Sequence, residues 1–475
     1  MLFFIPLYPK FPLFSVPDTY VSIRLEDIFI AVLVGIFWLK LLLTRDFSIF
    51  NWRLTKYVIL YFAIGLLSVA SGIFITKNIV PHLALLHFLR RVEYLSLLFV
   101  AYFSFKETKQ LKTYGKIILI ATFGVIFYGL GQKFFGWPVV STMNKEFSKG
   151  LILQLTWWAR VNSTFAGHYD LAAYMVMVLC LVLAALMVVR KWAWRIFVIL
   201  LGVFSYYILI LTASRVSFGA YLLGGLIVLL LGGKKWWIAP FLALSILGMV
   251  FSDDLGQRYA ATFKIDLSFM SGLVKMRPPE IAMGPTATPE PTVTPEAEAP
   301  GVFIPGQPRA TLTPTPTPTP FLSEEATPAA YFEPTALAVG RSTDIRLKVE
   351  WPRAARAFAK NPLLGTGYSS ITLATDNDYL RMLGETGLLG LAAFFLIILE
   401  IIRRFFVTVF SRTTGRVEKG IVLGAIGLGV GYFLNATFID VFEASKIAFF
   451  FWIVMGVVLK VCDLENNRIK DQKIQ

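Results

Sequence analysis

The chain has 475 residues, of which 56% are hydrophobic and only 16% are charged, with a formal net charge of +15 at pH 7. A soluble domain carries about 25% charged residues, so this composition excludes an ordinary soluble protein and predicts an all-α polytopic membrane protein. With two cysteines and three histidines that form no cluster, we expect no disulfide framework, no metal and no cofactor. The positive charge is interpreted as a topology signal and predicts no nucleic-acid partner.

The first segment, residues 2–22, carries Lys10 and four prolines and lacks a continuous apolar stretch. We therefore expect no cleavable secretory signal here. Two placements of this segment remain open. The N-terminus is outside if the segment lies along the membrane interface, and inside if it forms a twelfth span.

Apolar runs after this segment predict eleven membrane-spanning helices, at 27–44, 57–76, 84–105, 117–135, 169–189, 195–212, 216–232, 236–252, 387–404, 421–438 and 446–461. Basic residues occupy every second connection and the C-terminal tail. They are Arg45, Arg53, Lys56, Lys106, Lys109, Lys112, Lys116, Arg190, Lys191, Arg195, Lys234, Lys235, Arg403, Arg404, Arg412, Arg416, Lys419, Lys460, Arg468 and Lys470. Because basic loops stay in the cytoplasm, these connections are predicted to be cytoplasmic.

This topology divides the chain into an N-terminal helix bundle (1–252), an extracytoplasmic loop (253–386), C-terminal transmembrane helices (387–462) and a cytoplasmic tail (463–475). The shorter loop 136–168 is then also extracytoplasmic. We expect a multi-pass protein of the cytoplasmic membrane whose active site faces outward.

The extracytoplasmic loop has two parts of different composition. Residues 278–335 are rich in proline and threonine and predict a disordered, extended insertion that serves as a spacer or has no role. Residues 342–386 predict an ordered helical arm. Within it, Pro352 is expected to kink the helix or, as we favour, to lie in the first turn of a second helix; Asn361-Pro362 ends the helix.

Four arginines on the predicted outer side point to a phosphate site: Arg160, Arg215, Arg346 and Arg353. Arginine binds phosphate oxygens through paired hydrogen bonds and stays charged. Arg215 lies in a very short outer turn, against the usual charge bias, which indicates a specific partner. The alternative is an arginine that extends to the interface or pairs with an acid; for Arg356 we favour that interpretation.

The histidines lie near the predicted outer face. His82 and His87 are interpreted as interfacial residues, whereas His168 is accompanied by Arg160 and Asp170 and is a candidate catalytic base. The charged residues inside the third span leave two possibilities open, an ion pair between helices or a substrate contact; they are Arg90, Arg91 and Glu93.

A polar motif, Asp376-Asn377-Asp378-Tyr379-Leu380, marks the point where the arm re-enters the membrane, and Glu385-Thr-Gly387-Leu-Leu-Gly390 follows it. Asp376 is the second candidate base. Asn377, Tyr379 and Glu385 are candidates for positioning the acceptor or the loop.

Four motifs in this order resemble the O-antigen ligase and O-antigen polymerase-like membrane proteins. They are Arg160…Ser163-Thr164-Phe165, Leu211-Thr-Ala-Ser214-Arg215, Trp351…Phe358-Ala-Lys-Asn361-Pro362-Leu-Leu-Gly365-Thr-Gly367, and Asn377-Asp378-Tyr379-Leu380…Glu385-Thr-Gly387-Leu-Leu-Gly390. With the large late loop they cover roughly residues 150–440.

The resemblance implies an inverting, metal-independent glycosyltransferase that takes glycan from an undecaprenyl-diphosphate-linked donor and transfers it to a glycan or lipid acceptor, for polysaccharide assembly in the cell envelope. It also implies that Arg215 and Arg346 hold the diphosphate. Ligases of this family carry histidine where this chain has Asp376. A carboxylate can serve as the base, but the difference favours a polymerase, or a transfer in which His168 is the base.

Two other classes remain as alternatives. A transporter or flippase of lipid-linked glycans would use the same arginines, although the sequence lacks the internal repeats typical of transporters. A membrane-anchored interaction protein would need one span. Membrane lipids and other polysaccharide-assembly proteins are the further partners that we expect.

Overall fold

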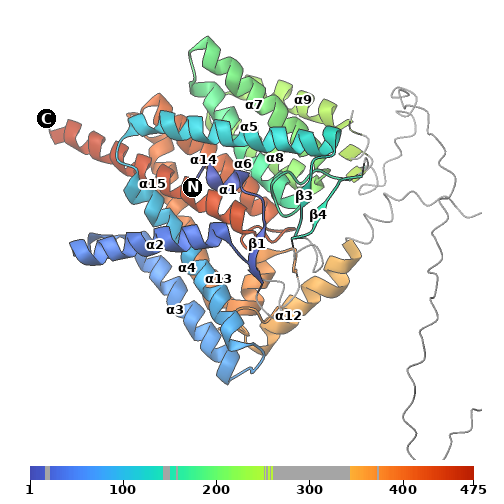
Figure 1. The fold of residues 1–475 in the computed structure, drawn as a ribbon. Helices are drawn as coiled ribbons and strands as arrows, with labels where there is room; N and C mark the ends of the chain where they lie inside the picture. Colours follow the sequence, from blue (N-terminus) through green and yellow to red (C-terminus); the bar gives the residue numbers. More distant parts are fainter. Residues whose placement is uncertain are drawn as a thin grey trace, which may run out of the picture.

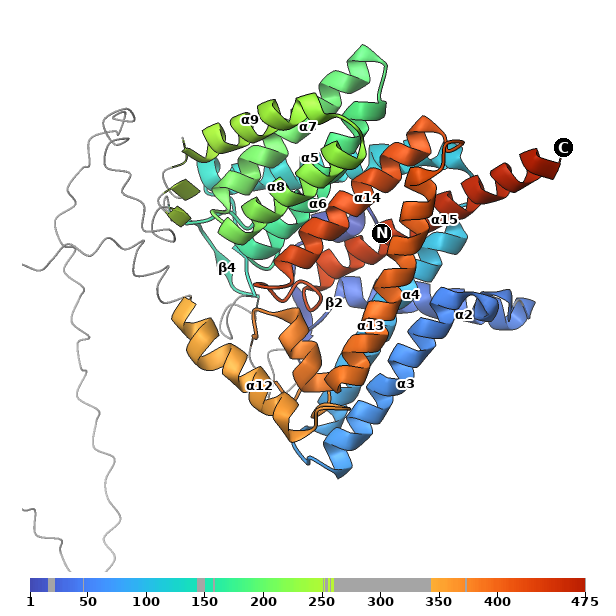
Figure 2. The ribbon, with the colours of Figure 1, turned by 180° about the vertical axis from the view of Figure 1, so that it is seen from behind.

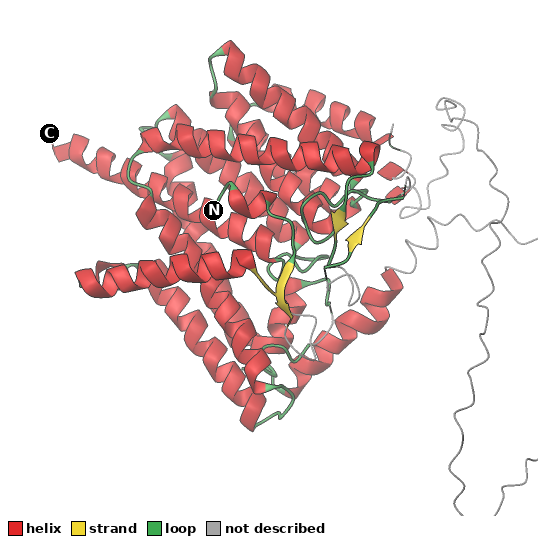
Figure 3. Ribbon diagram, viewed as in Figure 1, coloured by secondary structure: helices red, strands yellow, loops and turns green. Residues whose placement is uncertain are grey.

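The computed structural model describes residues 1–15, 22–45, 47–142, 150–156, 159–250, 343–371 and 374–474, together with residues 252, 255, 256, 258 and 259. Helices make up most of this part (Figure 3). The strands within it form two short antiparallel pairs, β1 (Pro12–Ser15) with β2 (Ser22–Arg24) and β3 (Val139–Val140) with β4 (Ile152–Leu153). The predicted insertion 278–335 lies outside the described residues.

Each of the eleven predicted spans coincides with a helix (Figure 1): α2 (Leu25–Thr44), α3 (Arg53–Phe74), α4 (Pro81–Ser104), α5 (Leu111–Phe135), α6 (His168–Val188), α7 (Trp192–Leu211), α8 (Arg215–Leu231), α9 (Ile238–Val250), α13 (Asp378–Phe410), α14 (Arg416–Asn435) and α15 (Ser445–Ile474). In the described part of the chain, 8 helices are long and apolar enough to cross a membrane. Helices α8 and α9 are shorter, with 17 and 13 residues, and α4 carries three charges near its middle. The protein is an all-α, multi-pass membrane protein.

The centre of the bundle is formed by α6, α8, α14 and α15, which lie together in both ribbon views (Figures 1 and 2). Helix α15 is the most buried of the candidate spans, with 83% of its apolar window inside the protein. Helices α8 and α14 approach closely at two glycines, because a Cβ on Gly224 would lie 2.6 Å from the carbonyl oxygen of Gly427. Helices α2, α3, α4 and α13 form the neighbouring wall.

The N-terminal residues fold into the bundle. They contain a single helical turn, α1 (Phe4–Leu7), whose Ile5 is buried. The Nζ of Lys446 at the start of α15 donates to the carbonyl oxygens of Tyr8 and Thr164. The described part of segment 2–22 therefore forms no twelfth span. Its Leu2 and Ile5 pack inside the protein, whereas the apolar side chains of Phe3, Phe11, Leu13 and Phe14 are exposed.

The ordered arm of the outer loop is helical, as predicted. A π-helical turn, η6 (Arg346–Glu350), runs into α12 (Trp351–Lys360), and Pro352 lies in the first turn of α12. The helix ends at the predicted residue, since Asn361 caps it and its Oδ1 accepts the backbone N–H of Leu364 at 3.2 Å.

Helix α13 consists of two segments, 378–386 and 388–410, that meet at Gly387, where φ is 67° and ψ is −170°. The loop after α12 completes the hydrogen bonds that the break leaves open. Pro362 O accepts from Leu388 N at 2.8 Å, and Gly367 N donates to Glu385 O at 2.9 Å. The predicted start of this span at 387 thus coincides with the break, and residues 378–386 form a separate helix between the arm and the span.

Candidate functional site

The turn that carries Asp376 is held by an acidic side chain from a distant part of the chain. Asp376 has a positive φ of 50°, a conformation that is uncommon for non-glycine residues, although aspartate adopts it more readily than most. Asp440 accepts the backbone N–H groups on both sides, from Thr375 at 2.9 Å and from Asn377 at 3.2 Å. The side chain of Asn377 then caps α13 by accepting Leu380 N at 2.9 Å. The hydrogen bonds from Asp440 and the Asn377 cap together fix the direction of the Asp376 side chain.

The carboxyl group of Asp376 is paired with Arg346. The Nε and Nη2 atoms of Arg346 both donate to Oδ2 of Asp376, at 2.9 and 2.7 Å, so Oδ1 lies outside this pair. Burial raises the pKa of Asp376 above its usual value, Arg346 opposes this rise, and the nearby charge of Asp440 adds to it. Two predicted site residues from separate segments therefore meet directly.

His168, the first residue of α6, is in contact with Arg160. The Nη1 atom of Arg160 lies 2.6 Å from Nε2 of His168. Because a guanidinium has only donors, Nε2 must accept this bond, and the ring is then neutral with its proton on Nδ1. The predicted companion Asp170 instead forms an ion pair with Lys10 at 3.9 Å. The lone pair that His168 would need as a base is thus already engaged.

Arg215 begins α8, directly after Ser214, whose Oγ caps the helix by accepting Ser217 N. Its largest charge interactions include those with Arg346 and Arg160, and His168 interacts in the same way with Arg258. Three arginines from separate segments, Arg160, Arg215 and Arg346, therefore form a cluster in which Arg215 is repelled by the other two. Such a cluster in a partly buried place is stabilised by an anion.

The three predicted positioning residues make contacts inside the protein. Asn377 is the helix cap described above. The hydroxyl of Tyr379 donates to Phe433 O at 2.9 Å, which ties α13 to α14. The carboxylate of Glu385 lies 3.5 Å from Nε of Arg381. These contacts favour loop positioning over direct contact with an acceptor.

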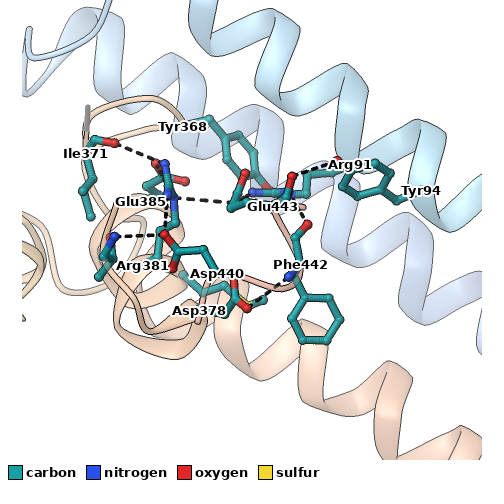
Figure 4. A network of polar contacts seen from close by, with 12 residues as sticks. Arg91, Tyr94, Tyr368, Ile371, Asp378, Arg381, Glu385, Asp440, Phe442 and Glu443 are labelled. Atoms are coloured by element: carbon teal, nitrogen blue, oxygen red, sulfur yellow. Dashed lines mark hydrogen bonds and ion pairs between the residues drawn. The ribbon is translucent and has the colours of Figure 1, made fainter. Parts of the chain in front are cut away.

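Sequence reasoning missed a buried charge network behind this turn (Figure 4). Nη1 of Arg381 lies 3.1 Å from Oδ2 of Asp440, and its Nε lies 3.5 Å from Oε1 of Glu443. Arg91 also pairs with Glu443 and donates to Phe442 O at 3.2 Å. Asp440 and Glu443 could have indicated this network in the sequence, because both acids lie in the short connection between two predicted spans.

This network also shows the partners of the two arginines in the third span. Arg91 makes its ion pair with Glu443, before α15, while Arg90 lies 3.4 Å from Asp27 at the start of α2. Both are contacts between separate segments, as the ion-pair interpretation predicted. Neither arginine pairs with Glu93 in these contacts.

A second group of polar side chains lies at the start of α12. Oε2 of Glu350, Nε1 of Trp351 and Nη1 of Arg353 are buried atoms without a hydrogen-bond partner among the described residues. Burial raises the pKa of Glu350 to about 7, and the nearby charge of Asp376 adds to the rise, while Arg346 and Arg353 oppose it. Predicted residue Arg353 is therefore placed near Glu350, which in turn lies near the Asp376–Arg346 pair.

One cavity of about 440 Å³ lies between α2 and α4 and contains the Asp27–Arg90 pair. None of the predicted site residues lines it. Within the described ranges, no group of three or more His, Cys, Asp or Glu side chains is arranged to hold a metal ion.

Comparison with known proteins identifies the domain that carries this site. Residues 200–395 match the family model described as O-antigen ligase, and no curated protein matches the chain. The matched range extends from α7 into α13 and includes Arg215, Arg346 and Asp376. The match supports glycan transfer of the O-antigen ligase or polymerase type, in polysaccharide assembly. Over residues 200–395 the chain is thus similar to the O-antigen ligase family, which supports an O-antigen ligase or polymerase-like protein.

Proposed function

We propose that the protein polymerises or transfers lipid-diphosphate-linked oligosaccharide units on the outer face of the cytoplasmic membrane. One observation carries the proposal: Arg346 is paired with Asp376, and Arg215, from a separate segment, interacts electrostatically with both Arg346 and Arg160. The family domain at 200–395 supports the class of reaction. The alternating charge of the loops supports the outward orientation.

The arginine cluster is suited to the donor. Displacing a diphosphate from an anomeric carbon develops negative charge on the leaving group. Fixed cations in a partly dry site stabilise that charge without having to reorganise. Arg215 and Arg346 are the proposed diphosphate ligands, with Arg160 beside them. In this scheme the chain's own arginines neutralise the leaving group, and the transfer is metal-independent.

Asp376 is the proposed base. Its Oδ2 is held by Arg346, and Oδ1 is left to accept the proton of an acceptor hydroxyl. The acceptor oxygen forms the new bond to the anomeric carbon, the bond to the diphosphate breaks, and the configuration inverts. Its raised pKa makes Asp376 a better proton acceptor than an ordinary aspartate. His168 is less suited, because Arg160 occupies its Nε2.

The absence of the ligase-type histidine at position 376 favours a polymerase over a ligase. In a polymerase, both the donor and the acceptor are lipid-linked units in the membrane, and other polysaccharide-assembly proteins supply them.

The base assignment is tested with purified protein in lipid nanodiscs and the lipid-diphosphate-linked oligosaccharide from a strain that lacks this gene. Asp376→Asn is expected to slow glycan transfer by about 10²–10⁴-fold, the usual contribution of a general base. His168→Gln, the matched variant, is expected to slow it less than tenfold. If His168→Gln slows transfer more than Asp376→Asn does, His168 and not Asp376 is the base.

The same preparation separates transfer from transport. In proteoliposomes, the transferase predicts longer glycans and release of the lipid diphosphate. If the wild-type protein moves the donor across the bilayer and forms no new glycosidic bond, it is a flippase and the proposal is wrong.

A further inference from the structure

We propose that Glu350, Trp351 and Arg353 form the subsite that binds the acceptor glycan beside Asp376. The inference rests on the proposed function and extends it, since it names the groups that recognise the sugar receiving the new bond.

Three buried polar atoms at the start of α12 lack hydrogen-bond partners. Oε2 of Glu350, Nε1 of Trp351 and Nη1 of Arg353 each lack a hydrogen bond within the described part of the protein, although all three atoms are buried. Buried polar groups are nearly always paired, so an unpaired one needs an explanation. Here three such groups lie within four consecutive residues. The three side chains remain partly exposed, so a ligand can reach them from the surface.

The three groups have the hydrogen-bonding chemistry that a sugar requires. A carboxylate accepts hydrogen bonds, whereas an indole N–H and a guanidinium donate them. A sugar ring offers neighbouring hydroxyls that both donate and accept, which matches this mixed set. The ring of Trp351 also lies 6.3 Å from that of Phe438, centroid to centroid, and such aromatic side chains provide the apolar surface against which ligands pack.

The three groups also lie near the proposed site. Glu350 follows Arg346 by four residues in η6, and its main charge interactions are with Asp376, Arg346, Asp440 and Arg353. The charge interactions of Arg215 include Arg346 and Arg160. Arg346 therefore interacts both with Arg215, the other proposed diphosphate ligand, and with Glu350 of this subsite, which brings the two parts of the proposed site close together.

Other ligands fit these groups less well. A phosphate would be repelled by the carboxylate of Glu350, and a metal cation would be repelled by Arg346 and Arg353. A neutral, hydroxyl-rich ligand uses all three groups without an uncompensated charge. We therefore assign Arg353 to the acceptor and not to the diphosphate.

Binding of a lipid-free oligosaccharide tests the subsite directly. The probe is the oligosaccharide that mild acid releases from the lipid-diphosphate-linked material, and its binding to the full-length protein in nanodiscs is followed by saturation-transfer NMR. Glu350→Ala and Trp351→Phe are each expected to weaken binding at least tenfold. The second change keeps an aromatic ring and removes the indole N–H together with part of the ring area. Arg356→Ala, an exposed arginine of the same helix, should bind as the wild type does.

Transfer from the lipid-linked donor is measured on the same samples, so that two failures can be told apart. If the wild-type protein transfers glycan but both variants bind the oligosaccharide as tightly as it does, the subsite is wrong and the proposed function stands. The subsite is also wrong if the variants raise the KM of the donor alone. If the wild-type protein transfers nothing, the proposed function fails and the subsite with it.

Discussion

Replacing Asp440 by asparagine should disable the site without touching any proposed ligand of the diphosphate. Asp440 accepts the two backbone N–H groups that flank Asp376 and pairs with Arg381 at 3.1 Å. An asparagine has one accepting oxygen, so its NH₂ group would face one of these N–H donors. The substitution also removes the charge that compensates Arg381.

The size of the effect follows from burial. The side chains of Arg381 and Asp440 are 11% and 14% exposed, and removing one partner of a buried ion pair costs about 3–5 kcal/mol. We expect a loss near the lower end, about 3 kcal/mol, because neither side chain is fully buried. Freed from its support, the Asp376 turn can relax from its positive φ. A displacement of about 1 Å at the reacting groups costs about 10²-fold in rate.

The assay compares glycan transfer and thermal unfolding in detergent for Asp440→Asn and for a matched change, Asp344→Asn. Asp344 also pairs with a basic residue, Lys348 at 3.1 Å, but the two side chains are 60% and 72% exposed. Exposed pairs contribute about 0–1 kcal/mol, so this control should behave as the wild type does. If Asp440→Asn keeps wild-type transfer and wild-type unfolding temperature, the support assigned to Asp440 is refuted.

Three further outcomes follow from particular groups. Gly387→Ala should lower the unfolding temperature clearly, since its φ is 67° and a Cβ would lie 2.3 Å from Leu363 O, whereas Gly115→Ala, with open space around it, should not. The pKa of Glu350 is raised to about 7, so the folded state holds its proton more tightly than the unfolded state. The stability of the wild type relative to Glu350→Gln should therefore fall as pH rises from about 4.5 to about 7 and stay level above that; a rise over this range in unfolding scans would contradict the burial argument. Because Asp376 must be ionised to act as a base, the transfer rate should increase with pH through its raised pKa, and Asp376→Asn should remove that limb of the pH profile.

Local patterns predicted the elements of this fold well. Pro352 and Asn361 mark the two ends of α12 because proline suits a first helical turn and asparagine caps a last one. Gly387 was placed at the start of a span, and the structure has a break there. Each of these features depends on a few adjacent residues, which a sequence displays directly.

Contacts between distant segments were harder to predict. Asp440 lies 63 and 65 residues from the amides that it accepts, and no periodic pattern links them. Asp170 stands two residues from His168, yet it pairs with Lys10, because a helix turns the two side chains to different faces. The contact between Arg346 and Asp376 was likewise not predicted, although both residues were named as site residues.

The central claim is that the arginine cluster holds the diphosphate of a glycan donor during transfer. The most direct measurement is the rate of glycan transfer from purified lipid-diphosphate-linked donor by Arg215→Ala, compared with Arg356→Ala at equal amounts of folded protein in nanodiscs. Removing one group that stabilises the negative charge on the leaving group lowers the catalytic rate by about 10²–10³-fold. Arg215→Ala should therefore transfer glycan more slowly by that factor, whereas the rate of Arg356→Ala should remain within about twofold of the wild-type rate. Equal rates for all three proteins would contradict the account.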